Sequence, residues 1–228
     1  MAVKLVNELI GAEKGKDIFI IGSGRSLDFL PDNFFDGRVV LGVNGAYQHH
    51  PVKYNICHHH QVVQDMINQS KDRKFKVITS EFWTCVIHSH LEGWRGYPYS
   101  HDETLTGDYY IYKHLNQTYT VIDLSVWDMP DYLVAGGTIV TTAIQFAYRL
   151  GARAIWLAGC DGGAIDGEWN RLEYKLKTNP DHFYHTQDQL RIMANKVRSC
   201  GVPVVSVNPF IDFGLEGHKF TFTWPPEQ

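Results

Sequence analysis

Short apolar runs recur along the chain, and longer segments with polar positions separate them. Most of these runs are continuous rather than alternating, and they are rich in valine and isoleucine: Asp17–Ile21, Val39–Val43, Lys53–Ile56, Phe75–Ile78, Ala154–Ala158 and Val204–Val207. Continuous apolar runs of this length are typical of strands that are buried on both faces of a parallel sheet. The pattern therefore predicts a mainly parallel sheet built from these six strands.

Two segments have the spacing of helices. After Thr138, apolar residues repeat at intervals of three and four as far as Leu150, and the next residue is a glycine that can stop a helix. A second helix is predicted to begin at Thr186, because Gln189 follows at the spacing of a capping box, and to close at Gly201. Strands alternating with helices predict an α/β fold, a Rossmann-like doubly wound sheet with helices on both faces.

Between residues 81 and 131 the alternation of apolar runs and helical segments is absent, and the segment is rich in tryptophan, tyrosine, histidine, glycine and aspartate. A structureless loop of this length is unusual inside a compact domain. We therefore expect a single domain over residues 1–228, with residues 81–131 as an insertion or lid. Its aromatic side chains can cover the core or stack on a ligand, and an oligomer contact is a further alternative.

Composition and charge narrow the class of protein. The chain has 228 residues, 44% of them hydrophobic, and a net charge of −4, which does not favour binding to nucleic acid or to an anionic membrane. The four cysteines lack CxxC spacing, no run of eighteen apolar residues occurs, and no signal-peptide pattern stands at the start. We expect a cytoplasmic protein with free thiols, which can form a homo-oligomer.

Four glycine-lined loops are the strongest chemical signal. In an open parallel sheet, loops that follow the strands meet at the carboxyl edge, where their backbone N–H groups and helix N-termini can hold a phosphate. The loops are Gly22-Ser23-Gly24-Arg25-Ser26, Gly42-Val43-Asn44-Gly45, Gly136-Gly137-Thr138 and Gly159-Cys160-Asp161-Gly162-Gly163. Their recurrence predicts a nucleotide-binding site.

Two residues are candidates for the chemistry itself. Asp161 ends a predicted strand and can bind a ribose hydroxyl or a divalent cation, or simply cap the next segment. His185 precedes the predicted cap Thr186, so the positive end of that helix favours a neutral imidazole that can accept a hydroxyl proton. The alternative for His185 is an exposed turn histidine.

The run Cys57-His58-His59-His60 is the most obvious place to look for a metal. Adjacent residues cannot all face one ion, and no second ligand motif stands elsewhere in the chain, so we expect no metal site there. The chain also lacks a Walker motif, the third glycine of a dinucleotide fingerprint and a GxSxG nucleophile elbow.

The order of these motifs resembles a known group of proteins. Ile20–Leu27 is similar to the GxGPSL turn of the bacterial sialyltransferases of glycosyltransferase family 42, and of the DUF115 family, which includes archaeal 6-hydroxymethyl-dihydropterin pyrophosphokinases. Asn44, the stretch from Gly136 to Asp161, and the stretch from His185 to Pro209 resemble later motifs in the same order. The resemblance covers residues 17–60 and 133–210 and leaves the aromatic segment unmatched.

This resemblance implies a nucleotide bound by Gly22–Ser26, Asn44, Thr138 and Asp161, with His185 as general base and no metal requirement. Two departures stand out. Arg25 replaces the usual proline, and Gly162-Gly163-Ala164 occupies the region in which the sialyltransferases place tyrosines that hold the departing phosphate. Arg171 and Tyr174 are the substitutes we expect for those tyrosines.

Three functional hypotheses remain open at this point. The first is a glycosyltransferase that moves a sugar from a nucleotide-sugar to the hydroxyl of a small-molecule or glycan acceptor, with no further cofactor. The second is a pyrophosphokinase that uses ATP and magnesium to modify a hydroxymethyl pterin-like compound. The third is a nucleotide-binding accessory protein without catalysis.

Overall fold

The computed structural model describes residues 4–58, 60–81, 83–84, 98–99, 105–115, 122–160 and 180–207. Of Arg25 and of residues 60–62, 83–84, 98–99 and 180–186 it describes the backbone alone. Within these ranges an eight-stranded parallel sheet has the order β1-β8-β5-β4-β3-β2-β9-β10. Its strands are Lys4–Leu5 (β1), Asp17–Ile21 (β2), Val39–Val43 (β3), Tyr54–Cys57 (β4), Lys76–Ser80 (β5), Tyr110–Tyr112 (β8), Ala154–Ala158 (β9) and Val204–Ser206 (β10).

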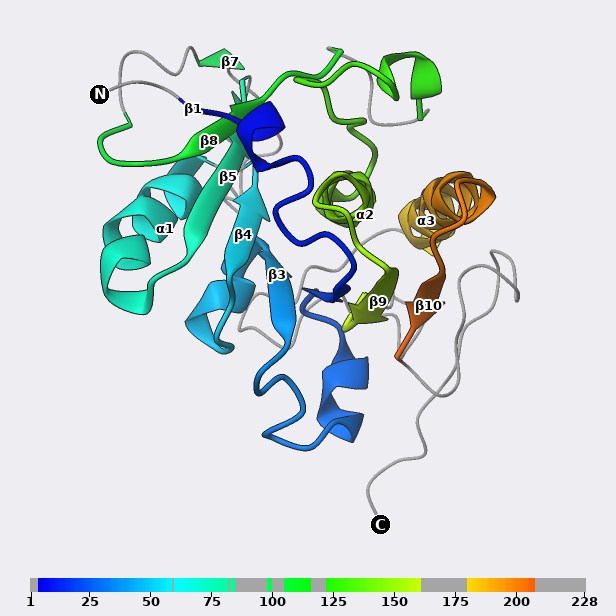
Figure 1. Ribbon diagram of the computed structural model, residues 1–228, viewed down its shortest axis with the longest axis horizontal. Helices are drawn as coiled ribbons and strands as arrows, with labels where there is room; N and C mark the ends of the chain where they lie inside the picture. The colour runs from blue at the N-terminus through cyan, green and yellow to red at the C-terminus, as the bar shows by residue number, and fades with distance from the viewer. Residues whose placement is uncertain are drawn as a thin grey trace.

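In the described part of the chain, three α-helices and several 3₁₀ helices connect these strands. The α-helices are His60–Arg73 (α1), Ile139–Arg149 (α2) and Pro180–Ser199 (α3). The 3₁₀ helices are Val6–Leu9 (η1), Arg25–Phe29 (η2), Asn44–Gln48 (η3) and Leu124–Val126 (η5), and a separate antiparallel pair joins Trp83–Thr84 (β6) to Pro98–Tyr99 (β7). In Figure 1, α1 lies on one side of the sheet, and α2 and α3 lie together on the other.

The direction of winding reverses beside β2. From β2 the chain continues outward through β3, β4 and β5, whereas β9 and β10 are added on the opposite side of β2. A parallel sheet that grows in both directions from one strand, with helices on both faces, is a doubly wound α/β sheet. The predicted fold class is therefore confirmed.

Side chains of the central strands alternate between two apolar cores. Ile18 and Ile20 of β2 join the core beneath α2 and α3, and Phe19 and Ile21 join the core that includes the buried face of α1. Successive residues of a strand point to opposite faces of a sheet. A strand with a core on each side must be apolar at nearly every position, which explains the continuous apolar runs.

Most of the predicted elements are confirmed. β2, β3 and β9 have the predicted residues, and β4, β5 and β10 differ from the prediction by one or two residues at their ends. α2 follows Thr138 as predicted, and the structure shows Thr138 as its cap, since the Thr138 side-chain oxygen accepts a hydrogen bond from the N–H of Val140 at 3.3 Å. β8 lies within residues 81–131, where no strand was predicted.

The predicted start of the last helix is wrong. α3 begins at Pro180, six residues before Thr186, so Thr186 and Gln189 lie inside the helix and form no capping box. Proline suits the first position of a helix, because its fixed φ is helical and its missing N–H would have no partner there. His185 is consequently in the second turn of α3 rather than in front of the helix, where the dipole effect used in the prediction is weaker.

One buried carboxylate ties the amino-terminal segment to the sheet. Glu13 is 1% exposed, and its oxygens lie 2.6 Å from Lys53 Nζ, 2.7 Å from the Tyr54 hydroxyl and 2.9 Å from Lys16 Nζ. Burial alone would raise the pKa of Glu13, but these three hydrogen-bond donors outweigh it and lower the pKa to about 2.

We predict that Glu13 makes folding sensitive to acid. Because its folded pKa of about 2 lies below the ordinary 4.5, its contribution is complete above pH 4.5 and is lost as the pH falls toward 2. Glu13→Gln should lower the free energy of unfolding at pH 7 by up to about 3 kcal/mol. Urea unfolding from pH 7 to pH 2 measures this, with Asp72→Asn, an exposed carboxylate of α1, as the control. A Glu13→Gln variant with wild-type stability at pH 7 would contradict the prediction.

Candidate functional site

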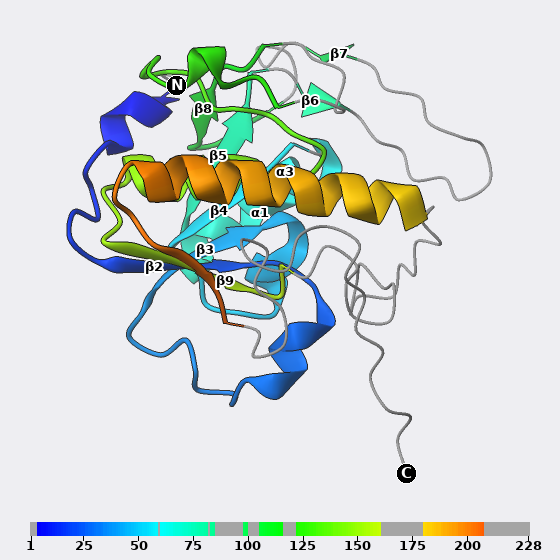
Figure 2. The same ribbon diagram turned by 90° about the vertical axis from the view of Figure 1, so that its right-hand side faces the viewer.

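The loops that follow β2 and β9 are joined at the carboxyl edge of the sheet. Ile21 pairs with Ala158 in the register of the two strands, and beyond them the N–H of Gly22 donates to the Ala158 carbonyl at 2.8 Å. The N–H of Gly24 then donates to the Gly159 carbonyl at 2.7 Å, and Figure 2 shows β2 and β9 side by side. This is the point at which the strand order reverses, the usual ligand position in open α/β sheets.

Close approach, rather than ligand contact, explains two of the glycines. A Cβ on Gly22 would overlap the carbonyl oxygen of Gly159, and a Cβ on Gly159, whose φ is +63°, would meet the side chain of Leu27 at 2.7 Å. The N–H of Gly159 donates to the buried Ser26 hydroxyl at 3.1 Å. Gly22, Gly24 and Ser26 therefore join the β2 turn to β9. The N–H groups of Gly22 and Gly24 already have carbonyl acceptors.

Asn44 stands at the carboxyl end of β3 in an uncommon backbone conformation. Its φ is +51°, a left-handed value that asparagine tolerates better than most side chains. The side chain of Asn55 donates to its carbonyl at 2.8 Å, and the Cys57 thiol lies 3.2 Å from its side-chain oxygen. These contacts fix Asn44 at the same edge as the glycine turn, one strand away.

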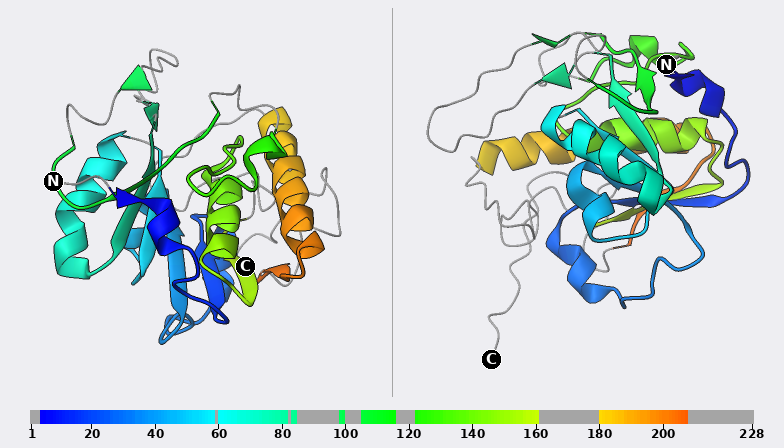
Figure 3. Two further views of the ribbon diagram at one scale, coloured as in Figure 1. Left: turned by 45° about the horizontal axis from the view of Figure 1, so that its top comes forward. Right: turned by 90° about the vertical axis from the view of Figure 1, so that its left-hand side faces the viewer.

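The start of α2 is packed closely against α3. The N–H of Gly137 donates to the side-chain oxygen of Gln189, and a Cβ on Gly136 would lie 2.7 Å from that same oxygen. Figure 3 shows the two helices side by side on one face of the sheet. Helix packing thus accounts for Gly136 and for the hydrogen bond of Gly137, and a phosphate contact by residues 136–138 stays a prediction.

A pocket of about 580 Å³ adjoins the glycine turn. Gly22 and Ser23 form one wall of the pocket, η2 and the residues after it form a second, and η3 with the residues after it forms a third. The side chains that bring polar chemistry to the pocket are Ser23, Asp28, Asp32, His49 and His50. Its volume is within the range of small-molecule sites.

Sequence reasoning did not identify this pocket. Asp28 and Asp32 had no place among the candidate residues, and neither had His49 and His50. The signal that was available is their position, because each lies in a connection that follows a strand at the carboxyl edge. Nothing in the spacing of these four residues from the glycine turn indicates that η2 and η3 enclose a common space.

A second polar group lies farther along the same edge. The hydroxyl of Tyr112, a fully buried residue at the end of β8, lies 2.8 Å from Nε2 of His58, which follows β4. The ring of His114 is 6.0 Å from that of His58. Within the described ranges, no three His, Cys, Asp or Glu side chains are grouped as metal ligands would be.

Several predicted site residues lie outside the described residues. They are Asp161, Arg171 and Tyr174, and the same holds for the side chains of Arg25 and His185. The backbone places residue 185 in α3, the helix that packs against α2. No helix in the described part of the chain is long and apolar enough to cross a membrane.

Comparisons with known proteins give one distant structural likeness. No model of a protein family matches the chain, and no curated protein matches it. Among solved structures, the chain is similar to the sialyltransferase CstII from Campylobacter jejuni in complex with a substrate analogue, cytidine-5'-monophosphate. The two chains are 13% identical with a TM-score of 0.39, over 86% of this chain and 80% of the other. At this level the likeness carries no information about activity.

We predict that the contact between Gly22 and Gly159 is essential to the carboxyl edge. Gly22→Ala should lower the free energy of unfolding by about 2 kcal/mol or more, because the added methyl group meets backbone and no side chain can move aside. Gly11→Ala is the control, since nothing lies within 4 Å of its added Cβ and only its φ of +74° is unfavourable, at a cost of about 1 kcal/mol. Thermal or urea unfolding compares the two variants. Equal stability of both would show that the two loops do not touch.

Proposed function

We propose that the protein is a nucleotide-dependent transferase, a glycosyltransferase that moves a sugar from a nucleotide-sugar to an acceptor hydroxyl. The observation that carries the proposal is the joining of the β2 and β9 loops at the reversal of strand order, beside a pocket of ligand size. The order of the sequence motifs, which resembles that of the family 42 sialyltransferases, supports transfer of a glycosyl group.

In this proposal the nucleotide lies along the carboxyl edge beside the turn formed by Gly22–Ser26. The N–H groups of Gly22 and Gly24 donate to β9, so the phosphate contacts fall to Ser23 and Arg25, which follow those two glycines. Ser23 also lines the pocket. Asp161 is assigned to the ribose, and Arg171 and Tyr174 are assigned to the departing phosphate.

The pocket between η2 and η3 supplies a place for the transferred group. It begins at Gly22 and Ser23, so a ligand phosphate at the turn would bring the group attached to it to the pocket entrance. Carboxylates such as Asp28 and Asp32 accept hydrogen bonds from hydroxyl groups. A sugar presents many hydroxyls, which makes the chemistry of these walls suitable for it.

The transfer itself needs a base and stabilisation of the leaving group. His185 is assigned as the base that takes the proton of the acceptor hydroxyl as that oxygen bonds to the sugar carbon. The bond from the sugar to the phosphate breaks in the same step, and the side chains assigned to the departing phosphate stabilise the charge left on it. A single displacement of this kind inverts the configuration at the sugar carbon.

We predict that CMP or UDP raises the melting temperature of the protein without added metal. Thermal shift with CMP, UDP, GDP and ATP, each with and without magnesium chloride, measures this. Stabilisation by ATP only when magnesium is present would contradict the glycosyltransferase proposal and favour pyrophosphoryl transfer. The absence of a shift with all four nucleotides would contradict nucleotide binding at this edge.

We also predict that His185→Ala keeps the nucleotide-induced shift but loses transfer, measured as nucleotide release from a nucleotide-sugar in the presence of acceptor. Removal of a general base typically lowers a rate by about 10²–10⁴-fold. His182→Ala, the same substitution one turn earlier on α3, is the comparison. Loss of transfer in His182→Ala with activity retained in His185→Ala would show that the base is assigned to the wrong residue.

A further inference from the structure

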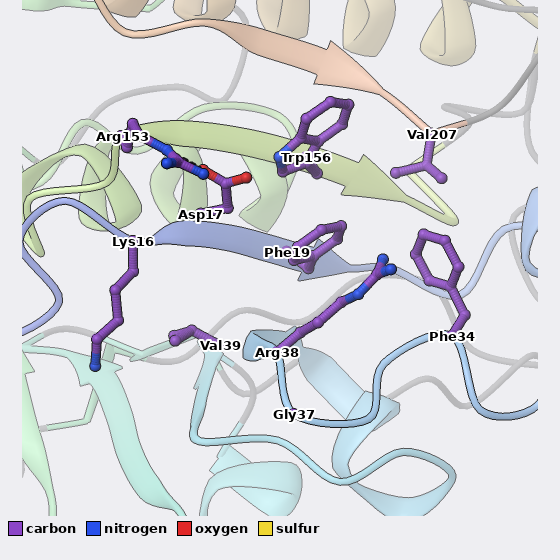
Figure 4. A pocket seen from close by; sticks show the side chains of 10 residues that line it. All are labelled: Lys16, Asp17, Phe19, Phe34, Gly37, Arg38, Val39, Arg153, Trp156 and Val207. Atoms are coloured by element: carbon purple, nitrogen blue, oxygen red, sulfur yellow. Dashed lines mark hydrogen bonds and ion pairs between the residues drawn. The ribbon is translucent and has the colours of Figure 1, made fainter.

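A second pocket lies on the face of the sheet that carries α1, away from the glycine turn. It has a volume of about 590 Å³ and extends along β2 and β9 from their amino ends to their middle (Figure 4). Its walls are mainly apolar and aromatic and include Phe19, Phe34 and Trp156. It shares no lining residue with the pocket beside Gly22.

Three aromatic rings and one guanidinium lie together in this pocket. Phe19 and Trp156 are register partners on β2 and β9, and their rings are nearly parallel, with 11° between planes and 5.9 Å between centroids. The guanidinium of Arg38 lies 4.7 Å from the centroid of Phe19 and 4.0 Å from that of Phe34. Figure 4 shows the Arg38 side chain reaching between these two phenylalanines.

Arg38 differs from the other cations of the pocket in its charge balance. Arg153 pairs with Asp17 at 2.9 Å, and Lys16 pairs with Glu13 at 2.9 Å. Among the described residues, no carboxylate pairs with Arg38, and its guanidinium contacts the rings of Phe19 and Phe34. A guanidinium carries its N–H donors in one planar fork, which can bind a carboxylate or phosphate in a bidentate manner.

We propose that this pocket binds a small ligand with an aromatic body and one carboxylate or phosphate group, and that Arg38 is its anion contact. The apolar walls suit the body, since Trp156, Val39 and Val207 line the same space. The volume is in the range of ordinary small-molecule sites. The charge of Arg38, which no described carboxylate neutralises, favours an anionic ligand over a neutral ligand of the same shape.

The test compares ligands that differ only in charge. Fluorescence titration with 2-naphthoate, 2-naphthyl phosphate and the neutral 2-naphthalenemethanol gives their dissociation constants. Subtracting the signal of a Trp156→Phe variant isolates the quenching at this pocket. We expect at least one of the two anions to bind saturably and about tenfold or more tightly than the alcohol, because a hydrogen bond to a charged group contributes to affinity. The stronger of the two identifies the anionic group.

Two variants assign the effect to Arg38. Arg38→Gln should remove the preference for the anion, and Arg38→Lys should keep part of it, because lysine retains the charge but not the planar fork. Lys71→Gln, an exposed cation on α1, makes the same change in net charge and should leave the preference intact. Circular dichroism melts establish that the variants are folded. Equal affinity for anion and alcohol, an unchanged preference in Arg38→Gln, or no saturable binding of either anion would overturn the proposal.

Discussion

The pairing of β2 with β9 is the constraint on which the rest of the structure depends. Five residues of each strand are in register, and the hydrogen bonds continue past the strand ends through Gly22 and Gly24. Without a side chain at residue 22, the two backbones can approach closely enough for this to happen. The pairing places β9 and β10 on the opposite side of β2 from β3. It therefore creates the reversal of strand order and the position of the candidate site.

This constraint changes what the glycine motif means. In the sequence, Gly22-Ser23-Gly24 has the composition of a phosphate-binding turn, and the loop that starts at Gly159 has the composition of a second one. In the structure, Gly22 and Gly159 are needed for close contact between two strand ends, and the N–H of Gly24 adds a hydrogen bond to the Gly159 carbonyl. A turn built in this way can still bind an anion. Its glycines by themselves, however, are evidence for the fold and not for a ligand. The evidence for a ligand comes from the pocket that the turn helps to enclose.

The sequence predicted the central sheet well, because β2, β3 and β9 are buried on both faces and their residues have little freedom to be polar. It did not predict α1, which buries mainly Val63, Met66 and Ile67 and, apart from Val62, is otherwise polar. The start of α3 was misplaced because a local pattern at Thr186 matched a capping box, whereas Pro180 begins the helix.

In the candidate site, the meeting of the loops at one edge could be predicted, because it follows from the parallel order of the strands. The pocket walls at Asp28 and His49 could not be predicted, since the distance between them depends on how η2 and η3 pack.

The positions of the two pockets follow from uneven covering of the sheet. α2 and α3 together cover one face over β2, β3, β4, β9 and β10, whereas on the other face α1 packs on β4 and β5. Over β2 and β9, the described residues on that second face belong to short segments such as η2 and the chain that leads into β3. Short segments cannot fill the space as a long helix does, so ligand-sized cavities remain at both ends of β2. The strand that organises the fold thus leads from one pocket to the other: Asp17 and Phe19 of β2 line one pocket, and Gly22 and Ser23, which follow the strand, line the other.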